Sequence, residues 1–182
     1  MRLLFLAPLA VALGIGGFLY WGLDSERDPS IIPSVRIDKP VPEFALPAID
    51  GVGVPGFSQA DLVGMEGPAL VNVFASWCFP CRVEHPVLVR MVDQHGIRLF
   101  GLNYKDAPEA ARDWLAEVGN PYTAVGSDVS GRAGIEWGVV GVPETFVINA
   151  EGTVLMRHVG PITTPEAEAA LLAALRDAEP QS

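Results

Sequence analysis

"SWCFPCRVEHP", residues Ser76 to Pro86, contains both cysteines of this 182-residue chain. Cys78 and Cys81 stand three positions apart in a Cys-x-x-Cys motif, and no other cysteine can pair with either. Such a pair can be a structural crosslink, half of a metal site or a working redox couple. The residues on both sides of the motif help to decide among the three.

The motif stands at a predicted junction between a strand and a helix. "ALVNVFA", residues Ala69 to Ala75, is a short apolar run that follows Gly67-Pro68, which is typical of a buried strand. The segment from Phe79 to Gln94 has apolar residues at helical spacing, namely Val83, Val87, Leu88, Met91 and Val92. Pro86 lies inside this helix and removes a backbone hydrogen bond, so we expect a kink there.

Redox chemistry explains the pair better than a structural role does. A disulfide between positions three apart closes a very short loop and removes little entropy from the unfolded chain. A Cys78 thiolate at the start of the helix would face unpaired backbone N–H groups and the positive end of the helix dipole. These interactions lower the thiol pKa, which in Cys-x-x-Cys sites falls from about 8.5 to roughly 3.5–7.5. Cys81, one turn deeper, is expected to keep its proton longer and to resolve a mixed disulfide.

A metal site is the third possibility. Cys78, Cys81 and His85 supply three potential ligands on neighbouring turns, whereas zinc favours four ligands, commonly from two separated knuckles. Copper(I) accepts fewer ligands, so a copper-handling chaperone stays open as an alternative. We expect no resident metal, and we expect His85 to be a surface or packing residue.

The rest of the chain alternates between predicted strands and helices. In order, the patterns predict a strand over 97–103, a helix over 107–119, a short helix over 128–137, two strands within 144–160 and a helix over 165–178. Asp106 is the expected N-cap of the first of these helices, and Thr164 is the expected N-cap of the last. This order predicts an α/β sandwich around a mixed sheet.

The composition favours a folded, acidic domain. Apolar residues make up 49% of the chain, enough for a sizeable core, and the formal net charge is −10. Nucleic-acid binding needs clustered cations, and the chain has 12 lysine and arginine residues against 22 acidic ones. We therefore expect no nucleic-acid partner.

The N-terminal segment departs from this pattern. Residues Leu3 to Leu23 carry no charge, and a helix of that length can cross a bilayer core of about 30 Å. Arg2 precedes the run and Asp24 follows it, so the remaining chain is expected outside the cytoplasm. We expect residues 1–23 to be a membrane anchor, 24–38 an extended linker and 39–180 the folded domain. A cleaved signal peptide is the alternative for the first of these segments.

Several segments together resemble a known family. "WCFPC" after an apolar strand looks like the active site of a thioredoxin fold. The chain resembles the DsbE/CcmG thiol–disulfide oxidoreductases, which are membrane-anchored proteins of cytochrome c maturation, in "LVNVFASWCFPCRVEHPVL", "GIRLFGLNYKD", "WLAEVGNPY", "GVVGVPETFVINAEGTV" and "RHVGPI". The resemblance implies a thioredoxin-like α/β fold, with a central mixed sheet flanked by helices and preceded by one N-terminal transmembrane helix.

The resemblance also implies roles for single residues. Cys78 would be the nucleophile and Cys81 the resolving thiol, with no cofactor beyond their redox-active disulfide. Pro143 would be the cis-proline of thioredoxin folds, which would leave the Val142 backbone beside Cys78 to pair with an extended peptide. The residues implied in substrate binding are Trp77, Phe79, Pro80, Val142, Pro143 and Glu144.

A difference from generic thioredoxins concerns proton transfer. Thioredoxins commonly carry a buried acid in the strand before the motif, where this chain has Asn72. Asn72 cannot exchange protons, so a carrier for Cys81 would be Glu84 or Glu144. We expect Glu84 to be solvated and Glu144 to lie near the cysteines if Pro143 is cis. A carboxylate close to the pair would also raise the thiol pKa values by like-charge repulsion.

The resemblance implies a reductase on the periplasmic side of the bacterial inner membrane, held there by a single span. Its substrate would be the disulfide of apocytochrome c or of a CcmH-type partner, and its electrons would come from a membrane donor of the DsbD or CcdA type. An oxidase or isomerase on the same fold remains an alternative, because the direction depends on which redox form is better stabilised.

Overall fold

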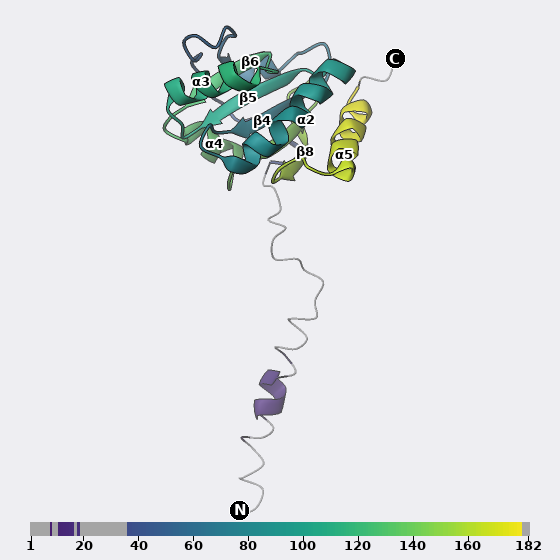
Figure 1. Ribbon diagram of the computed structural model, residues 1–182. Helices are drawn as coiled ribbons and strands as arrows, with labels where there is room; N and C mark the ends of the chain where they lie inside the picture. The colour runs from purple at the N-terminus through teal and green to yellow at the C-terminus, as the bar shows by residue number, and fades with distance from the viewer. Residues whose placement is uncertain (1–7, 9–10, 17, 19–35, 180–182) are drawn as a thin grey trace, which may run out of the picture. The chain divides into compact units, whose positions relative to one another are not determined.

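The computed structural model describes residues 8, 11–16, 18 and 36–179 (Figure 1). The chain divides into two units, Met1–Pro33 and Ser34–Ser182, and residues 11–16 of the first unit are helical. Most of the expected anchor and linker, residues 1–23 and 24–38, lies outside the described residues. Among the residues described, no helix combines the length and apolar character needed to cross a membrane.

A six-stranded mixed sheet forms the centre of the second unit (Figure 1). Its strand order is β1-β8-β7-β4-β5-β6. The bounds are β1 Lys39–Pro40, β4 Ala69–Phe74, β5 Leu99–Tyr104, β6 Ala124–Asp128, β7 Glu144–Ile148 and β8 Thr153–Val159. Strands β4, β5 and β6 are parallel, whereas β7, β8 and β1 join antiparallel. A separate two-stranded sheet pairs β2 (Ala45–Leu46) with β3 (Phe57–Ser58), and the 3-10 turn η2 (Gln59–Leu62) follows it.

Strand β4 is buried along its whole length because both faces of the sheet are covered. Leu70 and Phe74 point into one apolar cluster, whereas Val71 and Val73 point into another, as the alternation of a strand requires. The continuous apolar run that predicted this strand is therefore the signature of a central strand packed on two sides.

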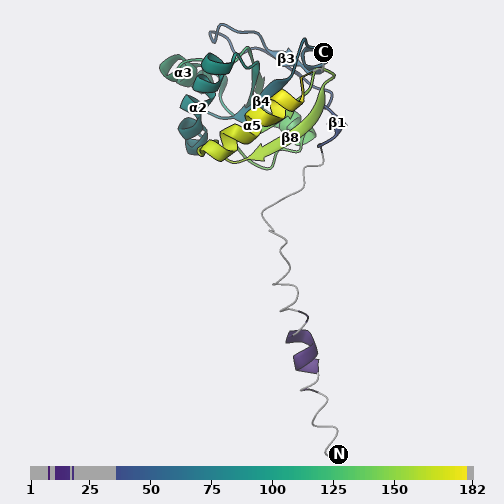
Figure 2. The ribbon, with the colours of Figure 1, turned by 90° about the vertical axis from the view of Figure 1, so that its right-hand side faces the viewer.

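Helices of unequal length cover the two faces. The cluster on one side takes buried residues from α2 (Phe79–His95), α3 (Pro108–Val118) and α5 (Pro165–Asp177). Figures 1 and 2 show α2 and α5 next to one another over this face. The cluster on the opposite side takes residues from α4 (Arg132–Trp137) and from β3. The thioredoxin-like α/β class with a mixed sheet flanked by helices is confirmed.

Two helix starts differ from the sequence expectation. Asp106 is not the N-cap of α3, because Ala107 takes that position and the Asp106 side chain is used elsewhere. Helix α4 begins only at Arg132, because Gly131 precedes it with a φ of 74°, a left-handed conformation that ends the turn before the helix. Helix α2 ends at His95, one residue beyond the expected end, and Gly96 follows it as a left-handed cap (φ 64°). The kink expected at Pro86 stays a prediction.

The topology brings the motif and the loop before β7 to one edge of the sheet. Val73 near the end of β4 pairs with Glu144 at the start of β7. The chain leaves β4 into the cysteine motif, and it enters β7 from the Val142–Pro143 peptide, which is cis as expected. Segments about seventy residues apart in sequence therefore meet at one end of two paired strands.

The last helix offers a test of the capping prediction. The Thr164 hydroxyl accepts a hydrogen bond from Ala167 N at 3.2 Å, as expected for an N-cap. Thr164→Ala should lower the free energy of unfolding by about 1 kcal/mol because a helix N–H loses its partner. Thr163→Ala is the matched control, an exposed neighbour that should change stability by less than half as much. Equal losses in chemical denaturation for the two variants would contradict the capping role.

Candidate active site

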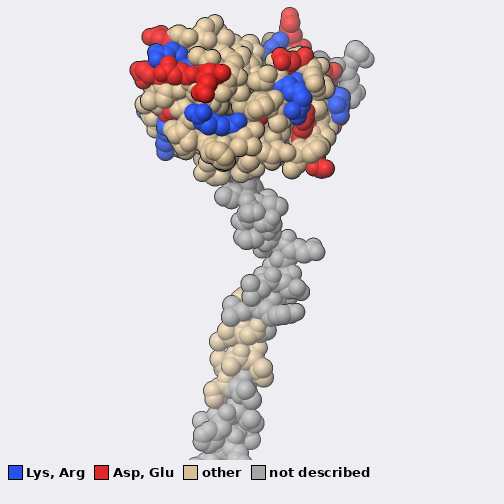
Figure 3. All heavy atoms as spheres, viewed as in Figure 1, with Lys and Arg blue, Asp and Glu red and all other residues tan. Residues whose placement is uncertain are grey.

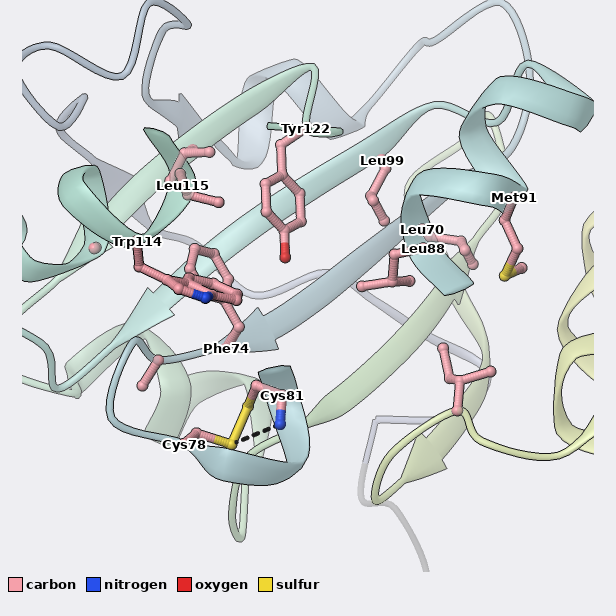
Figure 4. Packing of buried hydrophobic residues seen from close by; sticks show 14 of the residues in the cluster. Leu70, Phe74, Cys78, Cys81, Leu88, Met91, Leu99, Trp114, Leu115 and Tyr122 are labelled. Atoms are coloured by element: carbon pink, nitrogen blue, oxygen red, sulfur yellow. Dashed lines mark hydrogen bonds between the residues drawn. A yellow bond between two sulfur atoms is a disulfide. The ribbon is translucent and has the colours of Figure 1, made fainter. Parts of the chain in front are cut away.

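The motif forms a disulfide at the first turn of α2. Cys78 and Cys81 are bonded, with their Cα atoms 5.3 Å apart. Cys78 takes the N-cap position, and its sulfur accepts a hydrogen bond from Cys81 N at 3.1 Å (Figure 4). Both residues are almost fully buried, so exposure does not distinguish them. The asymmetry lies in the backbone N–H of Cys81, which donates to the Cys78 sulfur.

Exposed apolar side chains surround this disulfide. Trp77 is 60% exposed and Phe79 is 75% exposed, although both are large and apolar. Pro80 is also exposed, and Val83 follows Phe79 one turn along the same helix face at 45% exposure. Apolar groups that surround a reactive, buried sulfur are typical of a surface that binds another protein.

The loop before β7 lies against the same cluster as the cysteines. Val142 is half-buried and packs against that cluster, and Pro143 is buried. The Pro143 carbonyl accepts a hydrogen bond from Gly160 N at 3.0 Å. Within the described part of the chain, no hydrogen bond forms to the Val142 backbone. Its N–H and C=O groups therefore have no protein partner among the described residues.

Glu84 is buried, which corrects the expectation that it is solvated. It is 1% exposed, and its carboxylate accepts hydrogen bonds from Asn72 Nδ2 at 2.9 Å and from Ile162 N at 3.0 Å. Burial raises the pKa of Glu84 from 4.5 to about 7, although both hydrogen bonds oppose the rise. The spacing of the buried positions Cys81, Glu84, Leu88 and Met91 on α2 could have revealed this from the sequence.

Glu84 belongs to a buried network centred on Asn72. The Asn72 amide donates to Glu84 and to Thr145 Oγ1 at 3.0 Å, and its oxygen accepts from the Tyr122 hydroxyl at 2.9 Å. Figure 4 shows the Tyr122 hydroxyl pointing into the core beneath α2. Burial and the nearby Glu84 raise the pKa of Tyr122 well above its usual value. Sequence reasoning missed Tyr122 and Thr145, because each looks like an ordinary core or strand residue.

Glu144 lies on the wrong face of the sheet for the cysteines. Thr145 faces Asn72 below α2, so its neighbours Glu144 and Phe146 point to the opposite side. Glu144 is fully buried and pairs with Arg157 Nε at 2.8 Å. Its other oxygen accepts from Val140 N at 2.8 Å and from Gly141 N at 3.0 Å. The expectation of a carboxylate beside Cys81 is wrong for Glu144, which instead holds the loop that leads to Pro143.

His85 is a packing residue. It is buried, its Nε2 lies 3.0 Å from the Gly119 carbonyl, and its ring contacts Trp114 with centroids 4.9 Å apart. Burial lowers the pKa of His85 below 6.5, against the opposing effect of the Gly119 and Val118 carbonyls. Among the described residues, no group of three or more His, Cys, Asp or Glu side chains could hold a metal ion.

The buried Glu84 makes stability depend on pH. Its folded-state pKa lies above the unfolded value, so the folded state gains from protonation. The free energy of unfolding should therefore fall by about 3 kcal/mol more in the wild type than in Glu84→Gln as pH rises from 4.5 to 7. Glu117→Gln removes an exposed carboxylate and should keep the wild-type slope. Parallel curves for the wild type and Glu84→Gln in denaturant titrations would exclude a raised pKa.

Comparisons with known proteins agree with this geometry. The AhpC/TSA family model matches residues 37–157. The thiol:disulfide interchange protein DsbE of Pseudomonas fluorescens is 47% identical over 161 residues, which cover 88% of this chain and 86% of that protein. The thiol:disulfide interchange protein HelX of Rhodobacter capsulatus is 44% identical over 157 residues, which cover 86% of each chain.

A solved structure extends the agreement to three dimensions. The crystal structure of a protein described as thiol:disulfide interchange protein DsbE from Chlorobium tepidum aligns with a TM-score of 0.65 at 29% identity. The alignment covers 76% of this chain and 94% of that one. With a disulfide at a helix N-terminus and a cis-proline before β7, the chain belongs to the AhpC/TSA family and, within it, to the DsbE/CcmG thiol:disulfide interchange proteins, which are thiol–disulfide oxidoreductases.

Proposed function

We propose that this oxidoreductase works as a periplasmic reductant, anchored to the bacterial inner membrane by residues 1–23. Its substrate is the disulfide of apocytochrome c or of a CcmH-type partner during c-type cytochrome biogenesis. The strongest support is that Cys78 caps α2 and that the Val142 backbone, which packs against the same apolar cluster, has no hydrogen-bond partner among the described residues. The resemblance to DsbE/CcmG proteins supports the choice of substrate.

The substrate binds as an extended peptide across the disulfide edge. The Val142 backbone supplies hydrogen bonds to the peptide, as one more strand would at a sheet edge. Trp77, Phe79 and Pro80 supply apolar contact on the side of α2. Pro143 and Glu144 act indirectly, because both are buried and fix the loop that presents Val142.

The reaction transfers two electrons through a mixed disulfide. The Cys78 thiolate attacks one substrate sulfur, forming a Cys78–substrate disulfide and releasing the second substrate sulfur as a thiolate. Cys81 loses its proton and attacks Cys78, which releases the first substrate sulfur. The substrate leaves as a dithiol, and the protein is left with the Cys78–Cys81 disulfide seen in the structure.

Glu84 is the proton acceptor for Cys81 in the second step. The two residues are three positions apart on α2, so they lie on one face of the helix, and both face the core. Its pKa of about 7 lets Glu84 hold or release a proton near neutral pH. Glu144, which points to the other side of the sheet, takes no part in this transfer.

A membrane dithiol donor of the DsbD or CcdA type reduces the protein again after each cycle. A reductant can persist in an oxidising compartment only if it is recharged and reacts selectively.

Figure 3 shows basic side chains scattered among acidic ones on the visible face, with acidic groups gathered above α3. The acidic residues exposed on α3 are Glu109, Asp113 and Glu117.

Trapping experiments test the order of attack and the substrate. Cys81→Ser in the full chain should accumulate mixed disulfides through Cys78 in cells that make c-type cytochromes, because the resolving step is blocked. Mass spectrometry after non-reducing electrophoresis should identify apocytochrome c or a CcmH-type protein as the attached partner.

Cys78→Ser is the matched control and should trap no partner and reduce no disulfide. Capture through Cys81 in this variant would reverse the assigned roles. Capture by Cys81→Ser of secreted proteins in general, without cytochrome-related partners, would contradict the specific function. A reduction potential near −120 mV, typical of an oxidant, would favour the oxidase alternative.

A further inference from the structure

Asp106 is used by the active-site loop rather than by the helix that follows it. Its carboxylate is 5% exposed and accepts four hydrogen bonds. Two come from Ser76, from the backbone N at 2.6 Å and from Oγ at 2.8 Å. The others come from Asn103 Nδ2 and from Ala107 N, each at 2.9 Å. One side chain therefore ties the loop after β5 to the loop after β4.

Trp77 is held by contacts to both of the loops that Asp106 joins. In sequence it follows Ser76, whose backbone N–H is bound by Asp106. Its indole Nε1 donates to the Lys105 carbonyl at 3.1 Å, and Lys105 precedes Asp106. Lys105 has a φ of 48°, a conformation that few non-glycine residues adopt, and its backbone N donates to the Asp128 carbonyl at 2.9 Å. The exposed indole is thus fixed by two anchored neighbours.

Cys78 has anchors that do not involve Asp106. Its backbone N donates to the Ala75 carbonyl at 3.1 Å, and its own carbonyl accepts from Arg82 N at 3.2 Å within α2. Its sulfur is held by Cys81 N. A loss of the Asp106 contacts should therefore loosen Trp77 while the thiol keeps its helix environment.

We infer that Asp106 is a positioning residue for protein substrates, which acts by holding the Trp77 indole beside the disulfide. The inference rests on the proposed docking role of Trp77, and it deepens that role by naming what orients the ring. The rate at which the protein reduces a peptide disulfide that contacts the indole therefore depends on Asp106. The rate with a small disulfide that reaches only the sulfur does not.

Asp106→Asn breaks the arrangement with almost no change in shape. Each carboxylate oxygen faces a backbone N–H, from Ser76 on one side and from Ala107 on the other. An amide group has only one oxygen, so one of these N–H groups must face an NH₂ group. Asp128→Asn is the matched control, because it changes only the side chain of a buried aspartate, which accepts from Gly134 N at 2.8 Å. The Asp128 backbone carbonyl, which binds Lys105 N, is kept in this variant.

The experiment compares two substrates across four reduced full-length proteins. The substrates are a synthetic peptide with an internal Cys-x-x-Cys disulfide and the small aromatic disulfide dithiobis(nitrobenzoate). Asp106→Asn should reduce the peptide at least about tenfold more slowly, as misplaced contacts do, and react with the small disulfide within about twofold of wild type. Trp77→Ala should behave in the same way, and Asp128→Asn should match the wild type with both.

The double variant decides whether Asp106 acts through Trp77. Asp106→Asn should cause no further loss in a Trp77→Ala background, because the group that it positions is gone. In Asp106→Asn the Trp77 indole N–H should exchange with solvent faster, as measured by NMR, whereas in Asp128→Asn it should not. Together these two results would support the inference, because a general loss of stability would not produce both of them.

The failures are distinguishable. If Trp77→Ala slows the peptide reaction but Asp106→Asn does not, or if the two losses multiply, the positioning role is wrong and the docking role stands. If Trp77→Ala reduces the peptide as fast as wild type, the docking role fails and the inference fails with it.

Discussion

The hydrogen bond from Cys81 N to the Cys78 sulfur is the contact on which the active site depends. A helix needs an acceptor for its first N–H groups, and serine, threonine, asparagine or aspartate oxygens usually supply it. Here a sulfur takes that place at the end of a fully buried central strand. The atom that caps α2 is therefore also the atom that we propose to attack the substrate, at the end of the sheet where the cis Val142–Pro143 peptide leads into β7.

Two buried glutamates lie on opposite faces of the sheet and have different surroundings. Glu84 lies on the cysteine side among hydrogen-bond donors without a cation, so burial dominates and its pKa rises to about 7. Glu144 lies on the other side and finds Arg157 and two backbone N–H groups. The first is the residue that we propose to exchange a proton with Cys81, and the second holds the loop before Pro143.

The sequence predicted most of the fold because local patterns and tertiary packing agree there. The apolar run 69–75, the helical spacing after Cys78 and the Thr164 cap all correspond to observed elements. The errors concern polar residues whose partners are distant in sequence. Glu84 binds Asn72 and Ile162, and Asp106 binds Ser76 rather than capping its own helix. Helical spacing could have shown that Glu84 is buried, but it does not show which groups Glu84 or Asp106 binds, because those contacts depend on which strands become neighbours.

The account requires that the two reduced cysteines differ in acidity because, among the described residues, only the Cys78 sulfur accepts a hydrogen bond from a helix N–H. The most direct test is alkylation of each thiol with iodoacetamide in the reduced full-length protein across a pH series, followed by mass spectrometry of the two sites. The account predicts that Cys78 reacts first, with a midpoint below the value of about 8.5 for an ordinary thiol, and that Cys81 reacts only at higher pH. Equal rates at both cysteines, with a common midpoint near that ordinary value, would contradict it.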